Sequence, residues 1–261
     1  MPSDDTERNP EARGASVLLN GLAVLEAFSI QEPVLGVTEI ARRVGLHKST
    51  VSRILATLEQ AGYVEREPAG GRFRLGLGLI ALTGPLLADL DVRRVAGAAL
   101  QRLTERTGET SALMVWNGHE AVVVEQVPSP KQVKHTATIG TRYDTYESSS
   151  VKVFLAELDA SDVAHLFERR LLAGTYDEHT LDAYTAELEQ VRTQGFAVND
   201  GRTSAEEVGI AAPVRDHRGV TTAAVMLSAP RFRVPPALLE VLARDVAEAA
   251  RDVSARLGSS A

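Results

Sequence analysis

The sequence contains no cysteine, and this absence excludes disulfides, iron–sulfur clusters, cysteine-ligated zinc and thiol nucleophiles together. Such a composition suits a reducing compartment, so we expect a cytoplasmic protein. The sequence also lacks any run of the roughly 18 apolar residues that a membrane span needs, because its longest uncharged run, residues 75–88, is interrupted by Gly84 and Pro85. We therefore expect no membrane role.

Basic residues are the minority among the charged side chains, with 28 Lys and Arg against 35 Asp and Glu and a formal net charge of −7. Taken as uniform, this charge argues against a nucleic-acid partner. It is not uniform, because residues 37–74 carry seven basic and four acidic side chains, whereas residues 1–36 carry two and six. One short basic stretch therefore lies inside an acidic chain, and its pattern has to decide its role.

The first 75 residues divide into a tail and three short helices. Residues 1–15 are acidic, contain Pro2, Pro10 and Gly14, and have no apolar run that can serve as a signal peptide, so we expect a disordered tail. A first helix is predicted from apolar residues at helical spacing, which are Leu18, Leu22, Leu25 and Phe28. A second begins near Gly36, with Glu39 as half of a capping box, and a third covers residues 48–60.

The second and third helices are joined only by the turn Gly45–His47, which is the connection expected of a helix-turn-helix. The face of the third helix away from its apolar stripe consists of Ser49, Ser52, Arg53, Ala56 and Gln60. Small residues allow close approach to a surface, an arginine can bind a guanine edge or a phosphate, and hydroxyls and amides at a helix N-terminus suit phosphate. The pattern predicts a recognition helix in a major groove.

Two short alternating runs, residues 63–66 and 72–75, flank a turn-rich link and predict a β-hairpin. Arg72 and Arg74 share a face of this hairpin, because strand side chains alternate, and can reach the DNA backbone or the minor groove. Residues 16–75 are therefore interpreted as a winged helix-turn-helix, with a purely structural three-helix bundle as the alternative. The residues expected to contact DNA are Thr38, Lys48, Ser49, Thr50, Ser52, Arg53, Arg72 and Arg74.

The rest of the chain alternates between helical and strand patterns, which predicts an α+β domain with an antiparallel sheet. Strands are expected over residues 110–116, 120–127, 132–139, 196–199, 209–215 and 220–228, and Asn117-Gly118 marks a hairpin between the first two. Helices are expected over residues 91–108, 148–158, 161–169, 180–194 and 236–257.

This domain shows no motif of a metal site, a nucleophile elbow or a phosphate-binding loop, so we expect no cofactor and no metal. Serines 148–150 with Lys152 leave open an enzyme that acts on small acids through a Ser149 or Ser150 nucleophile, although serines before an apolar helix are more often caps. Serines and free amides at a helix start also suit a carboxylate or phosphate. A binding pocket is therefore the favoured interpretation.

The runs LLNGLAVLEAF, GVTEIARRVGLHKSTVSRILATLEQAGYVER and GRFRLGLGL, all within residues 17–79, resemble the N-terminal domain of the IclR family of bacterial transcriptional regulators. The resemblance extends over about residues 16–257. It implies a linker helix over 76–90 and a GAF-like effector-binding and oligomerisation domain over 91–261. It also implies homodimers or pairs of dimers on a double-stranded DNA operator, with a small organic effector that is often a carboxylate.

The resemblance also implies where the effector binds. The residues expected to bind it are Met114, Trp116, Ser148, Ser149, Ser150, Asn199, Asp200, Gly209 and Ser228. The chain departs from the family pattern at Tyr146, where a histidine is usual, at Arg202, where an acid is usual, and at Gly209, where a small polar residue is usual. These departures imply an altered pocket lining, so the identity of the effector does not carry over, and a loss of effector response stays open.

Overall fold

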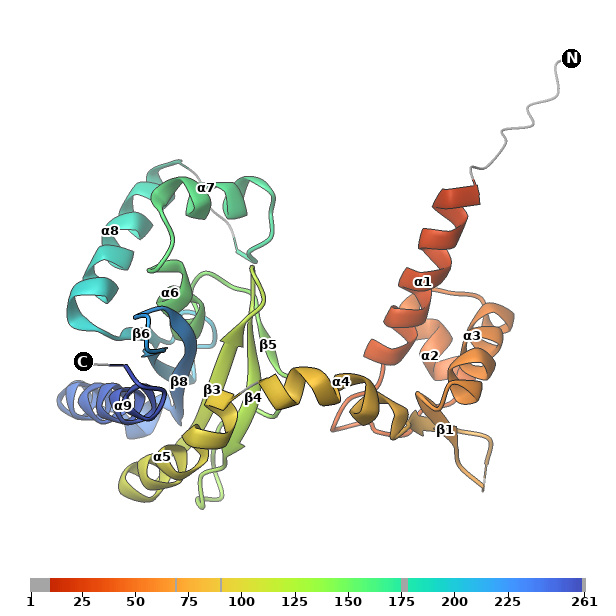
Figure 1. Cartoon of the computed structure of the whole chain (residues 1–261), viewed down its shortest axis with the longest axis horizontal. Helices are drawn as coiled ribbons and strands as arrows, with labels where there is room; N and C mark the ends of the chain where they lie inside the picture. The colour runs from red at the N-terminus through yellow and green to blue at the C-terminus, as the bar shows by residue number, and fades with distance from the viewer. Residues whose placement is uncertain (1–9, 69, 90, 175–177, 260–261) are drawn as a thin grey trace, which may run out of the picture. The chain divides into compact units, whose positions relative to one another are not determined.

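The computed structural model describes residues 10–68, 70–89, 91–174 and 178–259, and the chain divides into two compact units, residues 1–89 and 90–261 (Figure 1). The first unit contains α1 (Pro10–Glu26), α2 (Val37–Val44), α3 (Lys48–Gln60), β1 (Val64–Arg66), β2 (Phe73–Leu75) and α4 (Gly78–Asp89). β1 and β2 pair antiparallel, with Val64 opposite Leu75. The three helices and the hairpin that the sequence predicts are present.

Local rules explain where α2 and α3 begin and end. The Glu39 carboxylate accepts a hydrogen bond of 2.7 Å from the Gly36 amide, which is the expected half of the capping box. Gly45 ends α2 with a φ of 66°, a left-handed conformation that glycine adopts without steric cost. α3 then begins at Lys48 after the N-cap His47.

The first helix differs from its prediction in two ways. α1 begins at Pro10, inside the stretch expected to be a tail, since proline is favoured in the first turn of a helix, where its missing N–H would have no partner. Residues 1–9 of that stretch lie outside the described residues. Of the predicted apolar stripe, Phe28 is buried, whereas Leu18 and Leu22 are 67% and 49% exposed. The core of this unit, built on Val24, Ile40, Val51, Leu55 and Phe73, reaches only the C-terminal half of α1.

The second unit is an α+β domain built on one six-stranded antiparallel sheet with the strand order β5-β4-β3-β8-β7-β6. Its strands are β3 (Thr110–Trp116), β4 (Ala121–Val127), β5 (Arg142–Tyr143), β6 (Ala197–Asp200), β7 (Glu207–Arg215) and β8 (Thr221–Pro230). Its helices are α5 (Asp91–Thr107), α6 (Ser149–Leu155), α7 (Ala160–Glu168), α8 (Glu178–Gln194), the 3₁₀ helix η1 (Arg231–Arg233) and α9 (Pro236–Arg256).

Helices cover both faces of this sheet (Figure 1). Side chains that alternate along a strand belong to opposite cores: Val225 of β8 packs with α5 and α9, whereas the neighbouring Met226 packs with α6, α7 and α8. The middle of β8 is therefore buried on both faces. None of the helices in the described part of the chain combines the length and hydropathy of a membrane-spanning segment.

The expected strand over residues 132–139 is wrong, because this described segment contains no strand. The edge of β4 is bonded instead to the residues that follow, since Val123 N donates to Thr141 O at 2.9 Å and Gly140 N donates to Val123 O at 2.8 Å. β5 then continues this pairing. Within residues 132–139, the His135 carbonyl accepts a hydrogen bond of 2.6 Å from the Thr110 hydroxyl. This carbonyl is therefore bonded to a side chain and not to the backbone of a neighbouring strand.

Candidate nucleic-acid interface and ligand site

The outer face of α3 is exposed as the helical period predicts. Val51 and Leu55 are fully buried, which turns the opposite face to solvent; its exposed members include Lys48, Ser49, Ser52, Arg53, Ala56 and Gln60. Thr50 is half-buried, and Thr38 is exposed on α2. The arrangement brings the expected DNA contacts of α3 together on one surface, although their contact with DNA stays a prediction.

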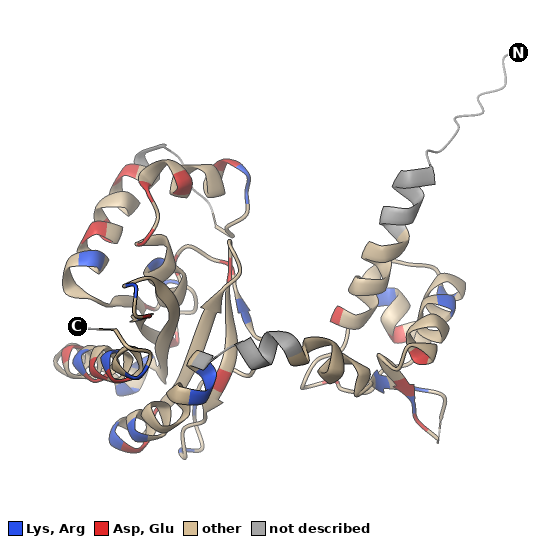
Figure 2. Ribbon diagram, in the orientation of Figure 1, with Lys and Arg blue, Asp and Glu red and all other residues tan. Residues whose placement is uncertain are grey.

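Three cations of α2 and α3 have no partner among the described residues. Among the described side chains of the first unit, Arg42, Lys48 and Arg53 have no ion pair or hydrogen bond, whereas the adjacent Arg43 bonds Glu32 and the Ala27 carbonyl. All three belong to α2 and α3 (Figure 2). An unpaired cation can bind a phosphate without first giving up a carboxylate. Arg42 is a further candidate that the sequence analysis does not name, although its place in the last turn of α2, outside the Ile40 and Ala41 stripe, is a readable signal.

The arginines of the β1–β2 hairpin are paired, in contrast. Arg72 donates to Glu39 Oε2 at 3.2 Å and to the Val34 carbonyl at 2.8 Å, and Arg74 donates to Glu65 Oε2 at 2.9 Å. The hydrogen bond from Gly36 and the charge of Arg72 hold the pKa of Glu39 below its usual value. Both arginines are about half exposed, but each already has a carboxylate partner. Arg72 therefore also has a structural role, which is to connect the hairpin to the start of α2.

In the second unit, expected effector residues lie on one face of the sheet and on α6 above it. Asn199, Gly209 and Ser228 stand side by side in register across β6, β7 and β8. A Cβ added to Gly209 would lie 3.1 Å from Ser149 Oγ and 3.8 Å from Asn199 Cβ, which places Ser149 directly over this row. Met114, also buried, lies on the same face in the α6 core.

Two expected residues lie apart from this row. Trp116 stacks on Phe154, near the C-terminal end of α6, with ring centroids 5.3 Å apart. Asp200 is next to Asn199 in a strand and therefore faces the other way, and its carboxylate forms an ion pair of 2.7 Å with Arg231. The structure brings Ser149, Asn199, Gly209 and Ser228 together. We call this group the serine row, and it is the candidate ligand site.

The serine row contains hydroxyls that lack partners. Ser228 Oγ is buried without a hydrogen bond, and the hydroxyl of Ser149, a residue that is 2% exposed, makes none in the described part of the chain. Ser148 and Ser150 bond each other at 2.9 Å, so the expected side-chain cap by Ser148 is absent. A buried unpaired hydroxyl costs about 1–3 kcal/mol, which a ligand atom or a water offsets.

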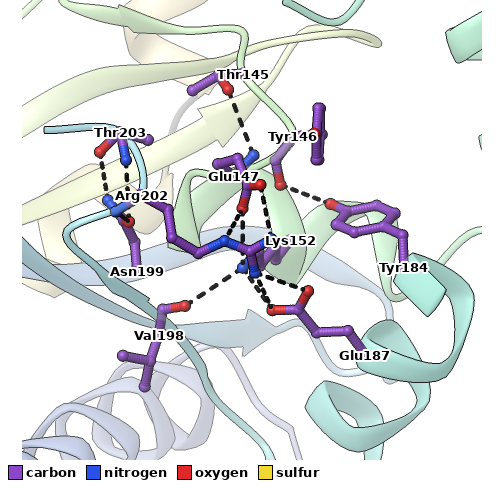
Figure 3. A network of polar contacts seen from close by, with 10 residues as sticks. All are labelled: Thr145, Tyr146, Glu147, Lys152, Tyr184, Glu187, Val198, Asn199, Arg202 and Thr203. Atoms are coloured by element: carbon purple, nitrogen blue, oxygen red, sulfur yellow. Dashed lines mark hydrogen bonds and ion pairs between the residues drawn. The ribbon is translucent and has the colours of Figure 1, made fainter. Parts of the chain in front are cut away.

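Beside the serine row, four charged side chains neutralise one another (Figure 3). Lys152 is fully buried, and its Nζ lies 2.6 Å from Glu187 Oε1 and 3.8 Å from Glu147 Oε2. Arg202 bridges the same carboxylates at 2.6 and 3.2 Å, and although burial lowers the pKa of Arg202, the two glutamates outweigh it and raise that pKa. Lys152 is thus not a free anion-binding cation, and in the described residues its Nζ makes no hydrogen bond to a serine.

The β6–β7 loop connects this network to the serine row. Asn199 Oδ1 accepts from the backbone amides of Arg202 and Thr203 at 2.9 and 3.3 Å. In the described residues no group of three or more His, Asp or Glu side chains is arranged to hold a metal ion. The site therefore offers hydroxyls, an amide and paired charges, which suit binding of a small polar molecule.

Comparison with known proteins identifies the two units. Residues 17–68 match the family model of the IclR helix-turn-helix domain, and residues 85–255 match that of the bacterial transcriptional regulator IclR C-terminal domain. The HTH-type transcriptional regulator XynR of Escherichia coli is 30% identical over 240 residues, covering 91% of this chain and 95% of XynR. KdgR of Escherichia coli, also an HTH-type transcriptional regulator, is 29% identical over 99% of this chain and 98% of its own length.

A solved structure extends the likeness to the fold. The crystal structure of an IclR homolog from Microbacterium hydrocarbonoxydans, complexed with 4-hydroxybenzoate, is 25% identical, with a TM-score of 0.77 over 92% of this chain and 98% of that one. The relatives are regulators, which favours DNA binding over the serine-nucleophile enzyme. The chain belongs to the IclR family, and it is a helix-turn-helix transcriptional regulator with a C-terminal effector-binding domain.

Proposed function

We propose that the regulator works in the cytoplasm and reads its operator with α3, using Arg53 and the neighbouring hydroxyls Ser49 and Ser52 for the bases and Lys48 and Arg42 for the phosphates. The observation that supports this proposal is the exposed face of α3 with its unpaired cations. Thr38 and Thr50 lie at the edges of this surface, and Arg72 and Arg74 add weaker backbone contacts because each is paired with a carboxylate.

Arg53→Ala tests this proposal. We expect it to weaken specific operator binding by about 1–3 kcal/mol while the protein stays folded, since the helix loses its one long cation on the base-facing side. The measurement is a titration of labelled DNA from the promoter regions beside the gene, with thermal unfolding as the folding check. Arg251→Ala, which removes an exposed arginine of α9, is the matched control. Equal affinities for the two variants would contradict the assignment of α3.

For the effector, the proposal is a small organic carboxylate bound at the serine row. The unpartnered hydroxyls of Ser149 and Ser228 support it, because hydroxyls can donate to carboxylate oxygens. The 4-hydroxybenzoate bound by the homologous protein belongs to the same chemical class. Effector binding then shifts the balance between DNA-competent and DNA-incompetent arrangements.

Thermal unfolding with 4-hydroxybenzoate and a panel of small carboxylates tests the effector proposal. We expect at least one of them to raise the melting temperature of the wild type and to do so less for Ser228→Ala. Thr221→Ala, which removes another buried hydroxyl without a hydrogen bond in the same strand, is the control. A panel that stabilises neither protein would instead favour a regulator that has lost its effector response.

The regulator is also proposed to act as a homodimer that pairs through the first unit. Leu18 and Leu22 of α1 and Leu82 of α4 are 67%, 49% and 59% exposed, and they line an apolar groove of about 550 Å³ together with Ile54 and Leu58. Such a contiguous apolar surface marks an interaction site. A second copy is the fitting occupant, because a single recognition helix gives little specificity and two copies match a palindromic operator.

A further inference from the structure

The first turn of α3 contains a pair of hydrogen bonds between His47 and Ser49. His47 is the N-cap residue, and its ring Nδ1 accepts from the Ser49 backbone amide at 3.3 Å. The same Nδ1 lies 2.8 Å from Ser49 Oγ. Both side chains are exposed on the surface that carries Lys48 and Arg53.

The two bonds together determine where the protons lie. A backbone N–H can only donate, so the Nδ1 that accepts from it carries a lone pair and the ring proton is on Nε2. An Nδ1 without a proton has nothing to give to Ser49 Oγ, and the short contact therefore requires the serine hydroxyl to be the donor. The only side-chain proton of Ser49 is therefore donated to the exposed ring of His47.

We infer that His47 determines the base preference of Ser49, by leaving its oxygen to face the DNA solely as a hydrogen-bond acceptor. In the major groove the donors are the amino groups of adenine and cytosine, whereas guanine and thymine present acceptors, and so do the phosphates. Ser49 then selects an amino base and is not a phosphate contact. This inference rests on the proposed placement of α3 in the groove.

Ser52 offers an internal comparison on the same helix. Its exposed hydroxyl makes no hydrogen bond with any described residue, so it rotates freely and can donate or accept. Thr57, the other exposed hydroxyl of α3, donates to the Arg53 carbonyl at 3.1 Å, one turn back along the helix. Among these exposed hydroxyls of α3, it is that of Ser49 that contacts a side chain, the ring of the N-cap His47.

Selection of bound fragments from randomised DNA with the full-length protein tests the inference. For the wild type we expect one position in each half-site at which adenine or cytosine is preferred over guanine or thymine by about two- to tenfold, which is the worth of one net hydrogen bond. Ser49→Ala flattens that position. His47→Gly also flattens it, because the freed hydroxyl can donate to guanine or thymine, while glycine remains acceptable at an N-cap.

Two controls separate the possible failures. Ser52→Ala leaves the Ser49 position unchanged, and Arg53→Ala alters a different position, which shows that α3 reads the operator. The inference is overturned if the Ser49 position prefers guanine or thymine, if His47→Gly leaves its preference intact, or if Ser49→Ala weakens all sequences equally. If Arg53→Ala also changes no position, the placement of α3 itself falls. If His47→Gly does not fold, the inference is still tested by two results: which base the wild type prefers at the Ser49 position, and whether Ser49→Ala loses that preference.

Discussion

Glu109, directly before β3, is a buried carboxylate held by cations from two distant segments. Its oxygens lie 2.7 Å from Lys131 Nζ and 2.7 Å from Arg233 Nη2, and its side chain is 5% exposed. Burial raises the pKa of Glu109, but the hydrogen bonds from Arg233 and Lys131 outweigh it and hold the pKa below its usual value. Ionised Glu109 therefore joins the start of the sheet to η1 and to the loop after β4.

The depressed pKa predicts how the stability of the second unit depends on pH. A carboxyl whose pKa is lower in the folded state stabilises the fold above its unfolded pKa of about 4.3, and this contribution is lost as the pH falls through the folded value. We expect the free energy of unfolding to decline below about pH 4.3. Glu109→Gln should lower the free energy of unfolding by about 1–3 kcal/mol at pH 7, and its further decline toward low pH should be smaller than that of the wild type.

Urea unfolding at pH 7 and at pH 4 measures both effects. Glu240→Gln, which changes an exposed carboxylate of α9, is the matched control and should unfold like the wild type at each pH. A Glu109→Gln variant that kept the full pH dependence of the wild type would show that the paired carboxylate is not its source.

At the scale of elements, local chemistry explains what the sequence could predict. The capping box at Gly36, the left-handed Gly45 and the 3.6-residue period of Val51 and Leu55 act within a few residues. The bounds of α2 and α3 follow from them. Strand alternation has the same local character, and it already forbids Asn199 and Asp200 from facing one site, as the ion pair of Asp200 with Arg231 confirms.

The failures depend on partners that the local pattern does not reveal. Residues 132–139 alternate as a strand does, but the edge of β4 is already bonded to Gly140 and Thr141. Lys152 has a pattern that suits anion binding, yet Glu187, 35 residues later, neutralises it. The pattern of each segment does not say which partner it meets, so only the folded chain reveals the pairing.

The β1–β2 hairpin gives a prediction about its two arginines. Arg74 is bonded to Glu65 on the neighbouring strand, so a phosphate must compete with a carboxylate for it. We expect Arg74→Ala to change the slope of log affinity against log salt by less than the roughly 0.9 that one full phosphate contact supplies. Lys48→Ala, which removes an unpaired cation, should change it by about the full amount.

Glu65→Gln is the reciprocal variant for the same hairpin. It frees Arg74, and we expect it to raise affinity for all DNA sequences and to steepen the salt dependence. Arg72→Ala differs from both, because it also removes the bonds to Glu39 and to the Val34 carbonyl and should lower the melting temperature. Equal salt slopes for Arg74→Ala and Lys48→Ala would show that the carboxylate partner does not restrain Arg74.

At the scale of the whole molecule, we expect the net charge of −7 to contribute to DNA recognition. Residues 37–74 are the basic stretch of an otherwise acidic chain, and the unpaired cations described in the first unit lie on α2 and α3 within it. Because sequence-independent DNA affinity grows with the number of phosphates neutralised, acidic surfaces elsewhere suppress binding in other orientations. We therefore expect the charge distribution to favour the surface of α2 and α3 that is proposed to contact the bases.

The absence of cysteine makes the proposed pairing of two copies directly testable. A single cysteine placed near the two-fold axis of a dimer can form a disulfide with the same cysteine of the second copy, because a separation below about 7 Å between their two Cα atoms suffices. We expect Leu18→Cys or Leu22→Cys, on the apolar face of α1, to give a disulfide-linked dimer on mild oxidation, seen on a non-reducing gel. Ile30→Cys is the control, since Ile30 is 62% exposed in the same unit but does not line the groove.

The same face should determine operator affinity as well as assembly. Leu22→Glu introduces a charge into the apolar groove, and we expect affinity for a palindromic operator to fall at least about tenfold toward that of a single half-site, whereas Ile30→Glu leaves it unchanged. Burial of an unpaired carboxylate opposes association, while an exposed leucine adds little to the fold of one copy. Three results together would place the pairing surface elsewhere on the chain. The wild type would sediment as a dimer, neither Leu18→Cys nor Leu22→Cys would cross-link, and Leu22→Glu would bind the palindrome as tightly as the wild type.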